Sequence, residues 1–327
     1  MKTFFQDGTS KEEFYFLGEQ PFFYIQELDG NMPDKFVYQG DSIKYKLDNE
    51  LVALYDKLRD LFFPNTEQYY AELSLMPIFV QSAGQDSECA LSAEQFQRYL
   101  QIEKFQNIPN FYRHLYLVDC QYYVGTIQNL LIGMEDAFIN YYLRITLVRP
   151  DATPDNPNDA LSIISPEVIS ISGLIENYFI KAYSILDMLC KIALEMEQPQ
   201  NSFETYKKTK SIKTLWGARA DLKINNTPNT VFEKCDLINT IESIRNEVVH
   251  NGAWELNPKL FAKFEEGEIV ERYMLFPDLL EGRLECVKNR KHFFGYGTKV
   301  NDVLPQIHRE YREKILNTVA ILNEMSI

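Results

Sequence analysis

Residues 165–197 read SPEVISISGLIENYFIKAYSILDMLCKIALEME, and this apolar stretch decides the fold class. Ser165 is typical of a helix N-cap, and Pro166 is typical of the first helical position. Apolar residues recur at helical spacing over the whole stretch, which is long enough for roughly 45 Å of helix. Asp187 is an acidic residue inside this apolar run. The stretch therefore predicts one long helix that is largely buried.

A second helix is expected over residues 231–250, VFEKCDLINTIESIRNEVVH, which follow the loop sequence NNTPNT. Gly252 stands where a left-handed C-terminal cap is expected, because glycine adopts that conformation without steric cost. A closing helix is expected over VLPQIHREYREKILNTVAILNEM, residues 303–325. These patterns predict that the second half of the chain is an all-α domain.

The rest of the chain also favours a mainly α fold. Residues 1–150 are acidic and aromatic-rich, with helical periodicity from Asp48 onward and short alternations near the N-terminus that could form a β-hairpin. The stretch RPDATPDNPNDA is rich in Pro, Asp and Asn, which is typical of a linker. The sequence therefore predicts a region of unknown role over 1–150, a linker over 151–164 and a helical domain over 165–327.

Composition limits the compartment and the partners. The five cysteines are scattered and form no C-x-x-C pair, which indicates neither a disulfide framework nor a zinc site and fits a reducing cytoplasm. The most apolar window is interrupted by charged residues, so no membrane span is expected. The net charge of −14 lies almost wholly in residues 1–164, which hold 12 Lys and Arg against 24 Asp and Glu. The second half is therefore nearly neutral.

Three polar residues end the second predicted helix within the sequence RNEVVH: Arg245, Asn246 and His250. Five helical steps rotate a side chain by about 140°, so Arg245 and His250 would point apart in the middle of a helix. The two side chains could converge only where the helix frays or turns, and Asn251-Gly252 supplies such an ending. A functional pair at this spacing therefore requires a helix terminus.

The motif RNEVVH, residues 245–250, resembles the R-x(4–6)-H motif of the HEPN superfamily, in which a polar residue often follows the arginine. The resemblance implies an antiparallel helical bundle over residues 165–327 and metal-independent endoribonuclease activity without a cofactor. It further implies a homodimer with a composite cleft, a role in toxin, phage-defence or stress systems, and an antitoxin or other regulatory protein as partner. Some HEPN toxins extend the motif to H-x-Y, whereas Asn251 and Gly252 follow His250 here.

The residue types suit cleavage of RNA by its own 2′-hydroxyl. Such cleavage needs a group that exchanges protons near neutral pH, which His250 would supply as general acid or base. It also needs a fixed cation beside the phosphate, and the planar guanidinium of Arg245 can bind two phosphate oxygens. Asn246 would position the histidine or the scissile phosphate. The expected products are a 2′,3′-cyclic phosphate and a 5′-hydroxyl.

Two other interpretations remain open at the sequence level. In the first, the domain is a non-catalytic HEPN-like module that binds nucleotide or RNA or serves for dimerisation. In the second, the motif is purely structural: Arg245 pairs with Asp187 of the preceding helix, and His250 satisfies the last carbonyls of its own helix. The net acidity of the chain favours the non-catalytic module over the endoribonuclease.

A basic stretch between the two helices is the expected RNA-contacting segment. Residues 207–223 carry six Lys and Arg and one Asp, a local charge of +5, and an aromatic side chain among them could stack on a base. Residues 283–299 repeat the basic and aromatic mixture with a lone G-Y-G, which indicates a loop and not a phosphate-binding motif. The candidate RNA-binding residues are Lys207, Lys208, Lys210, Lys213, Trp216 and Arg219.

Overall fold

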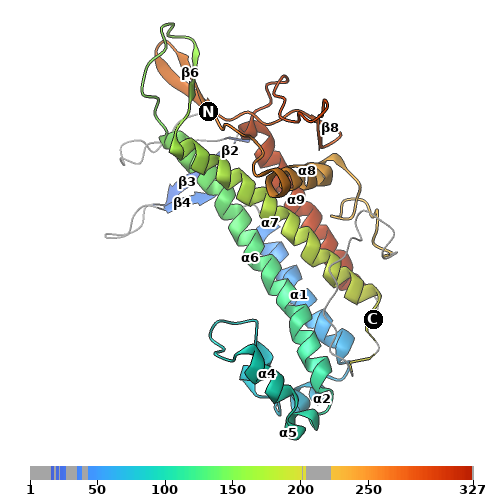
Figure 1. Ribbon diagram of the computed structural model, residues 1–327. Coiled ribbons are helices and arrows are strands. Elements are labelled where there is room, and N and C mark those ends of the chain that lie inside the picture. Colours follow the sequence, from blue (N-terminus) through green and yellow to red (C-terminus); the bar gives the residue numbers. More distant parts are fainter. Residues whose placement is uncertain are drawn as a thin grey trace.

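The computed structural model describes residues 43–200, 202–203 and 222–325, and the backbone of four short strands between residues 16 and 38 (Figure 1). The chain is mainly helical, as the sequence predicts. The helices are α1 (Ile43–Phe62), α2 (Thr66–Leu73), α3 (Ile78–Ser82), α4 (Ala93–Leu100), α5 (Glu103–Gln106), α6 (Phe111–Leu147), α7 (Pro166–Glu197), α8 (Asp236–Asn251) and α9 (Val300–Glu324).

Four long helices, α1, α6, α7 and α9, run side by side as a bundle (Figure 1). Arg144 near the end of α6 donates a hydrogen bond of 3.0 Å to Ser170 near the start of α7. At the opposite ends of the same two helices, the Tyr116 hydroxyl donates to Glu195 over 2.5 Å. Helices α6 and α7 are therefore antiparallel along almost their whole length.

The start of α7 confirms the predicted cap. The Ser165 hydroxyl accepts a hydrogen bond of 3.3 Å from the backbone N–H of Val168, and Pro166 occupies the first helical position, where a missing N–H costs no hydrogen bond. The helix continues to Glu197 without a break, because its apolar residues face the three other long helices at every turn. Helix α7 is thus the central element of the bundle.

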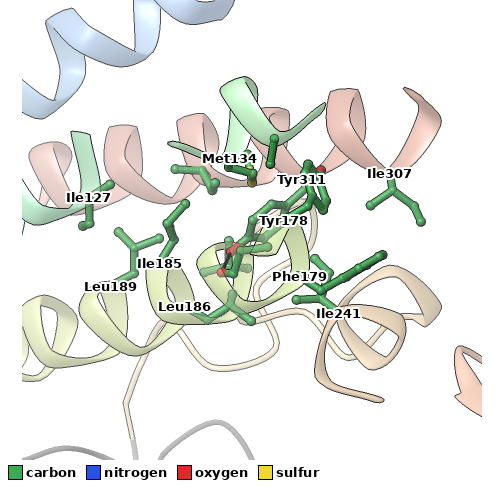
Figure 2. Packing of buried hydrophobic residues seen from close by; sticks show 14 of the residues in the cluster. Ile127, Met134, Tyr178, Phe179, Ile185, Leu186, Leu189, Ile241, Ile307 and Tyr311 are labelled. Atoms are coloured by element: carbon green, nitrogen blue, oxygen red, sulfur yellow. Dashed lines mark hydrogen bonds between the residues drawn. The ribbon is translucent and has the colours of Figure 1, made fainter. Parts of the chain in front are cut away.

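The core lies where side chains from α6, α7, α8 and α9 meet (Figure 2). Met134 of α6 and Tyr178 of α7 are fully buried there. The Tyr311 hydroxyl of α9 donates a hydrogen bond of 2.7 Å to the Ala182 carbonyl of α7, so this buried phenol keeps a partner. Ile241 joins the same core from α8 and fixes that helix against α7.

The structure differs from the predicted division at residues 151–164. One continuous hydrophobic core contains residues from both sides of this stretch, from Leu47 of α1 to Leu322 of α9. Part of the expected linker is also a strand, β5 (Ala160–Ile163), which pairs with a strand of the second half. Polar loops on the surface of one domain have the same Pro, Asp and Asn content as true linkers, which explains the difference.

A three-stranded antiparallel sheet caps the end of the bundle where α6 stops and α7 starts. It contains β5, β6 (Leu260–Glu265) and β7 (Glu268–Tyr273), with Leu161 opposite Ala262 and Ala262 opposite Arg272. The Arg272 side chain is buried and donates a hydrogen bond of 2.7 Å to the Val148 carbonyl after α6. A separate pair, β8 (Leu279–Leu280) and β9 (Arg283–Leu284), lies next to α8.

Four short strands precede α1: β1 (Phe16–Leu17), β2 (Gln20–Pro21), β3 (Phe23–Gln26) and β4 (Lys35–Tyr38). β1 pairs with β2 and β3 with β4, both antiparallel. The side chains of these strands and residues 27–34 lie outside the described residues, so the hairpin expected near the N-terminus stays a prediction. In the part of the chain from Ile43 onward that the structure describes, no helix combines the length and the apolarity that a bilayer crossing requires.

Candidate functional site

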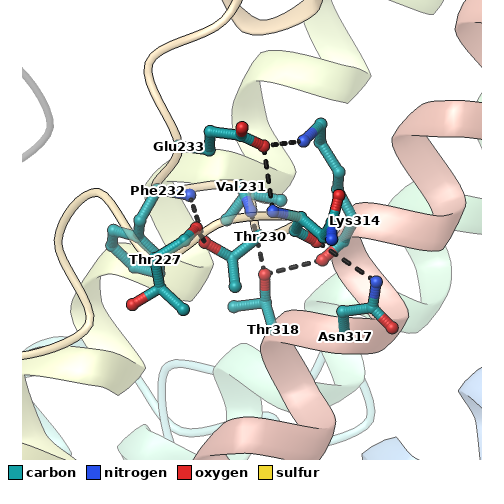
Figure 3. Close-up of polar contacts among 9 residues, drawn as sticks. Thr227, Thr230, Val231, Phe232, Glu233, Lys314, Asn317 and Thr318 are labelled. Carbon is teal, nitrogen blue, oxygen red and sulfur yellow. Dashed lines mark hydrogen bonds and ion pairs between the residues drawn. The ribbon is translucent and has the colours of Figure 1, made fainter.

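The segment before α8 is tied to α9 by polar contacts (Figure 3). The buried N–H of Val231 donates to the Thr318 hydroxyl over 3.0 Å, and the Asn317 side chain donates to the Asn229 carbonyl over 3.2 Å. Lys314 forms an ion pair with Glu233, which lowers the pKa of that carboxyl. Because α8 begins three residues after Glu233, these contacts set where the helix starts.

The far end of α8 carries the predicted motif. The helix continues through His250 to Asn251, and Gly252 ends it in the left-handed conformation with φ of 93°, as the sequence predicts. His250 is therefore still helical, in the last turn, and its side chain is exposed. The motif thus sits at a helix terminus, but the chain turns only after the histidine.

Arg245 lies between α8 and α7. Its guanidinium carbon is 4.5 Å from the ring centroid of Tyr183 on α7, a distance at which the ring face attracts a cation. The same guanidinium donates a hydrogen bond of 2.8 Å to the side-chain oxygen of Asn246. The aromatic face and the amide together hold the arginine in one orientation.

The two helices that form the site are antiparallel. Arg245 near the end of α8 contacts Tyr183 in the second half of α7. Further along the chain, beyond α8, the backbone N–H of Trp254 donates to the carboxylate of Glu176, which precedes Tyr183 on α7. The resemblance to HEPN proteins implies such a pair of antiparallel helices. The site is therefore built on two rigid elements and not on a loop.

Asn246, Val249 and His250 lie on one side of α8, here called the α8 ridge; Val249 and His250 are exposed and Asn246 is partly buried. Asn246 and His250 are four residues apart, so their side chains share this face, and Val249 between them is 49% exposed. Arg245 lies about 140° around the helix from His250, on the flank that meets α7. Asn246 therefore stands between the arginine and the histidine.

Partly buried acidic and phenolic groups surround Arg245. Burial raises the pKa of Tyr183, and the charge of Glu242 adds to that shift while Arg245 opposes it. Burial also raises the pKa of Glu242, against the opposing charges of Arg283 and Arg245. Among the described residues, no carboxylate forms a direct ion pair with the half-buried guanidinium of Arg245.

Asp187, the expected partner of Arg245 in the structural interpretation, forms an ion pair of 3.1 Å with Lys191, four residues later on α7. It also acts on Tyr183 through its charge, which helps to raise the pKa of that phenol. Asp187 therefore lies near the site, while Arg245 contacts Tyr183 and Asn246.

The opposite flank of α8 meets the segment after β7. Burial would raise the pKa of Glu247, but hydrogen bonds from Lys291 and Asn251 and the charges of Lys291 and His292 lower it below its usual value. Lys291 and Glu247 are 2.9 Å apart. Residues 283–299, which sequence patterns indicate as a loop, are therefore fixed to α8 by the ion pair between Lys291 and Glu247.

Sequence patterns did not point to Tyr183 or to Glu242 as site residues. Tyr183 lies four residues before Asp187 on the face of α7 that meets α8, and this spacing is the only sequence signal for it. The expected RNA-binding residues Lys207, Lys208, Lys210, Lys213, Trp216 and Arg219 lie outside the described residues, so their role stays a prediction.

Among the described residues, no three or more His, Cys, Asp and Glu side chains come together as metal ligands would. The motif presents a held guanidinium and an amide and, on another flank of α8, an exposed imidazole; these groups suit phosphate binding and proton transfer. Comparison of the chain with protein-family models, with curated proteins and with solved structures finds no match.

Proposed function

We propose that this protein is a metal-independent endoribonuclease, and that Arg245, Asn246 and His250 carry the reaction. One observation supports the proposal most: Arg245 is held by Tyr183 and Asn246 at the end of α8, with His250 exposed one turn after Asn246. The resemblance of residues 245–250 to the HEPN motif supplies the reaction class. Substrate RNA would approach along the α8 ridge.

The proposed reaction needs two proton transfers and one charge stabiliser. The 2′-hydroxyl oxygen attacks the adjacent phosphorus and loses its proton to a base, while the bond from phosphorus to the 5′-oxygen breaks and that oxygen gains a proton. Arg245 stabilises the extra negative charge on the phosphate oxygens in the transition state. The imidazole of His250 exchanges the protons, since histidine titrates near neutral pH.

A homodimer gives this chemistry a complete site. In one protomer Arg245 and His250 lie on different flanks of the same helix, so a second α8 ridge would bring the missing group to each side. His250 of one protomer would then accept the proton, and His250 of the partner subunit would donate one to the leaving oxygen. The exposed side chain of Val249, at the centre of the ridge, suits such a contact.

A second candidate function is a non-catalytic module that binds RNA or nucleotide, or that serves for dimerisation. It is favoured by the surroundings of His250: within the described residues, no hydrogen bond or ion pair orients this imidazole. General acid–base catalysts are usually held in place by a third group. The two functions share the same surface and differ in whether the phosphodiester bond is cut.

Incubation with total RNA in EDTA separates the two functions. We expect the wild-type protein to degrade RNA in EDTA, and the His250→Ala and Arg245→Ala variants to leave the RNA intact. The fragments should carry 5′-hydroxyl ends, which polynucleotide kinase labels without prior phosphatase treatment. Arg245→Lys keeps the charge but loses the planar fork, so we expect it to restore only a small part of the rate.

The matched control is Arg309→Ala, because Arg309 is an exposed arginine on α9 and lies outside the ridge. We expect this variant to cleave like the wild type. Equal degradation by wild type and His250→Ala would exclude His250 as the proton-exchanging group. Intact RNA with every protein, together with RNA binding by the wild type, would favour the non-catalytic module.

A further inference from the structure

A basic hairpin lies against α8 on the side of His250. It comprises residues 279–292, with strands β8 and β9 and a second tight turn after them. We propose that this basic hairpin is the surface that binds the phosphate backbone of the RNA substrate. The inference rests on the proposed function, and it assigns to these residues the role that sequence patterns gave to residues 207–219.

The first half of the basic hairpin is fixed to one face of α8. The Asn239 side chain donates a hydrogen bond of 3.0 Å to the Glu281 carbonyl, and the backbone N–H of Leu284 donates to the Ser243 hydroxyl over 3.1 Å. Because Asn239 and Ser243 are four residues apart, they present one continuous face to the hairpin. The chain from 281 to 284 therefore runs along α8 toward its C-terminal end.

The second half reaches the last turns of the helix. Val287 and Arg290 exchange backbone hydrogen bonds of 3.0 and 3.1 Å, which closes a turn with Lys288 at its tip. Lys291 then pairs with Glu247, one turn beyond Ser243, over 2.9 Å. The basic hairpin thus contacts α8 at three successive turns and is held as a rigid part of the site.

His250 belongs to this same face of α8. It follows Ser243 by seven residues, which is almost two full turns, so both side chains point in nearly the same direction. Arg245 faces α7 on the other flank. A strand of RNA that lies on the basic hairpin would therefore pass beside His250, at the edge of the α8 ridge.

The charge of the basic hairpin contrasts with that of the whole chain. Residues 279–292 hold four Lys and Arg against two glutamates, a local charge of +2, whereas the chain carries −14. Glu285, one of these two glutamates, accepts a hydrogen bond of 2.6 Å from the Tyr296 hydroxyl. Cations concentrated on one face of an acidic protein are what a polyanion binds.

Three of the four cations are exposed and ready for phosphate. Arg283, Lys288 and Arg290 are exposed, and none forms an ion pair with another described residue. Acidic groups also lie on this side: Glu247 already pairs with Lys291, Glu281 belongs to the hairpin, and Glu242 acts on Arg283 only at a distance, through its charge. A partner with closely spaced phosphates would satisfy these cations without displacing an existing pair.

The test measures RNA binding in the His250→Ala background, where the probe is not cut. The probe is a fluorescein-labelled single-stranded RNA of mixed sequence, titrated at several KCl concentrations. The hairpin set Arg283→Gln, Lys288→Gln and Arg290→Gln is compared with the control set Lys46→Gln, Lys104→Gln and Arg309→Gln. The control residues are exposed on α1, α5 and α9, so both sets change the net charge equally.

We expect the hairpin set to weaken binding roughly tenfold at low salt and to make the slope of log Kd against log [KCl] shallower by about 2, since each lost phosphate contact removes about 0.7 from the slope. The control set should shift Kd less than about twofold. Circular dichroism and thermal unfolding of both sets check that the fold is kept.

Equal weakening by both sets, or none by the hairpin set, would overturn the role of the basic hairpin. The wild-type cleavage assay keeps this result apart from the proposed function. If the wild type cuts RNA while the hairpin set binds it normally, only the inference about the hairpin fails. If the wild type does not cut and the His250→Ala protein does not bind, both proposals fail.

Discussion

The guanidinium carbon of Arg245 lies 4.5 Å from the ring centroid of Tyr183, and this contact joins the motif helix α8 to the central helix α7. It replaces the pairing with Asp187 that a structural interpretation of the motif expects. An aromatic face holds a cation without neutralising it, whereas a carboxylate would compete with phosphate for the guanidinium. Arg245 therefore keeps its charge available for a ligand.

The first prediction concerns this contact. Replacing Tyr183 with leucine removes the ring face but keeps an apolar side chain against α8, so Arg245 loses one of its two holding contacts. We expect RNA cleavage to fall roughly tenfold, in line with the 0.5–2 kcal/mol typical of a partly buried cation–π contact. Single-turnover cleavage of a labelled RNA measures the effect.

Tyr183→Phe is the matched control because it keeps the ring and removes only the hydroxyl. We expect this variant to cleave at a rate within about twofold of the wild type. A phenylalanine variant as slow as the leucine variant would show that the hydroxyl and not the ring face is the important group.

The second prediction concerns the attachment of the basic hairpin to α8. Gly282 has φ of 74°, and a Cβ atom there would lie 2.1 Å from the Asp236 carbonyl oxygen at the start of α8. Gly282→Ala must therefore push the hairpin away from the helix. We expect a loss of about 1–3 kcal/mol in the free energy of unfolding and weaker RNA binding. Urea denaturation and the RNA titration measure the two effects.

Gly297→Ala is the control that separates displacement of the basic hairpin from the effect of backbone strain. Gly297 also has positive φ, 64°, but a Cβ atom there would meet nothing within 4 Å. We expect this variant to lose some stability from strain alone and to bind RNA like the parent. Equal RNA affinities for the two alanine variants would argue that the docked position of the hairpin has no part in binding.

Sequence patterns located the features of this fold that depend on neighbouring residues. Ser165 and Pro166 marked the start of α7, and Gly252 marked the end of α8, because helix caps are made by residues within one turn of the terminus. The hydrogen bond between Arg245 and Asn246 also joins chain neighbours. These elements could be predicted because their causes are local.

The contacts that sequence patterns missed join residues far apart in the chain. Tyr183 is 62 positions from Arg245, and the hairpin reaches Ser243 from Leu284, 41 positions away. Neither contact has a local sequence signal, because tertiary packing decides it. Asp187 was the natural acidic partner for Arg245 by pattern, yet Lys191 stands one helical turn away on the same face and takes that ion pair.

The third prediction concerns pH. Burial raises the pKa of Glu255, three residues beyond Gly252, to about 7, while Lys259 opposes the shift. The folded state then holds a proton that the unfolded state releases from pH ~4.5 upward. The contribution of Glu255 to stability is therefore lost as pH rises from ~4.5 through about 7. Glutamine does not ionise, so Glu255→Gln avoids this decrease in the free energy of unfolding. The variant should therefore be more stable than wild type by on the order of 1 kcal/mol at pH 8, and nearly equal to it at pH 4.

Urea denaturation at pH 4, 6 and 8 measures this difference. Glu268→Gln is the matched control, because it removes an exposed carboxyl on β7 and changes the charge as Glu255→Gln does. A stability difference for Glu255→Gln that is the same at all three pH values would contradict a raised pKa at this residue.

The fourth prediction concerns dimerisation across the α8 ridge. Val249 is 49% exposed between Asn246 and His250, so an aspartate there would place two like charges at the centre of a two-fold contact. We expect Val249→Asp to elute as a monomer in size-exclusion chromatography with light scattering and to lose RNA cleavage, since each protomer alone holds Arg245 and His250 on different flanks.

Ile132→Asp is the control, because Ile132 is 59% exposed on α6, away from α8. It should stay dimeric and active. A Val249→Asp protein that is monomeric yet fully active would show that one protomer completes the site, and a dimer retained in that variant would place the subunit contact elsewhere.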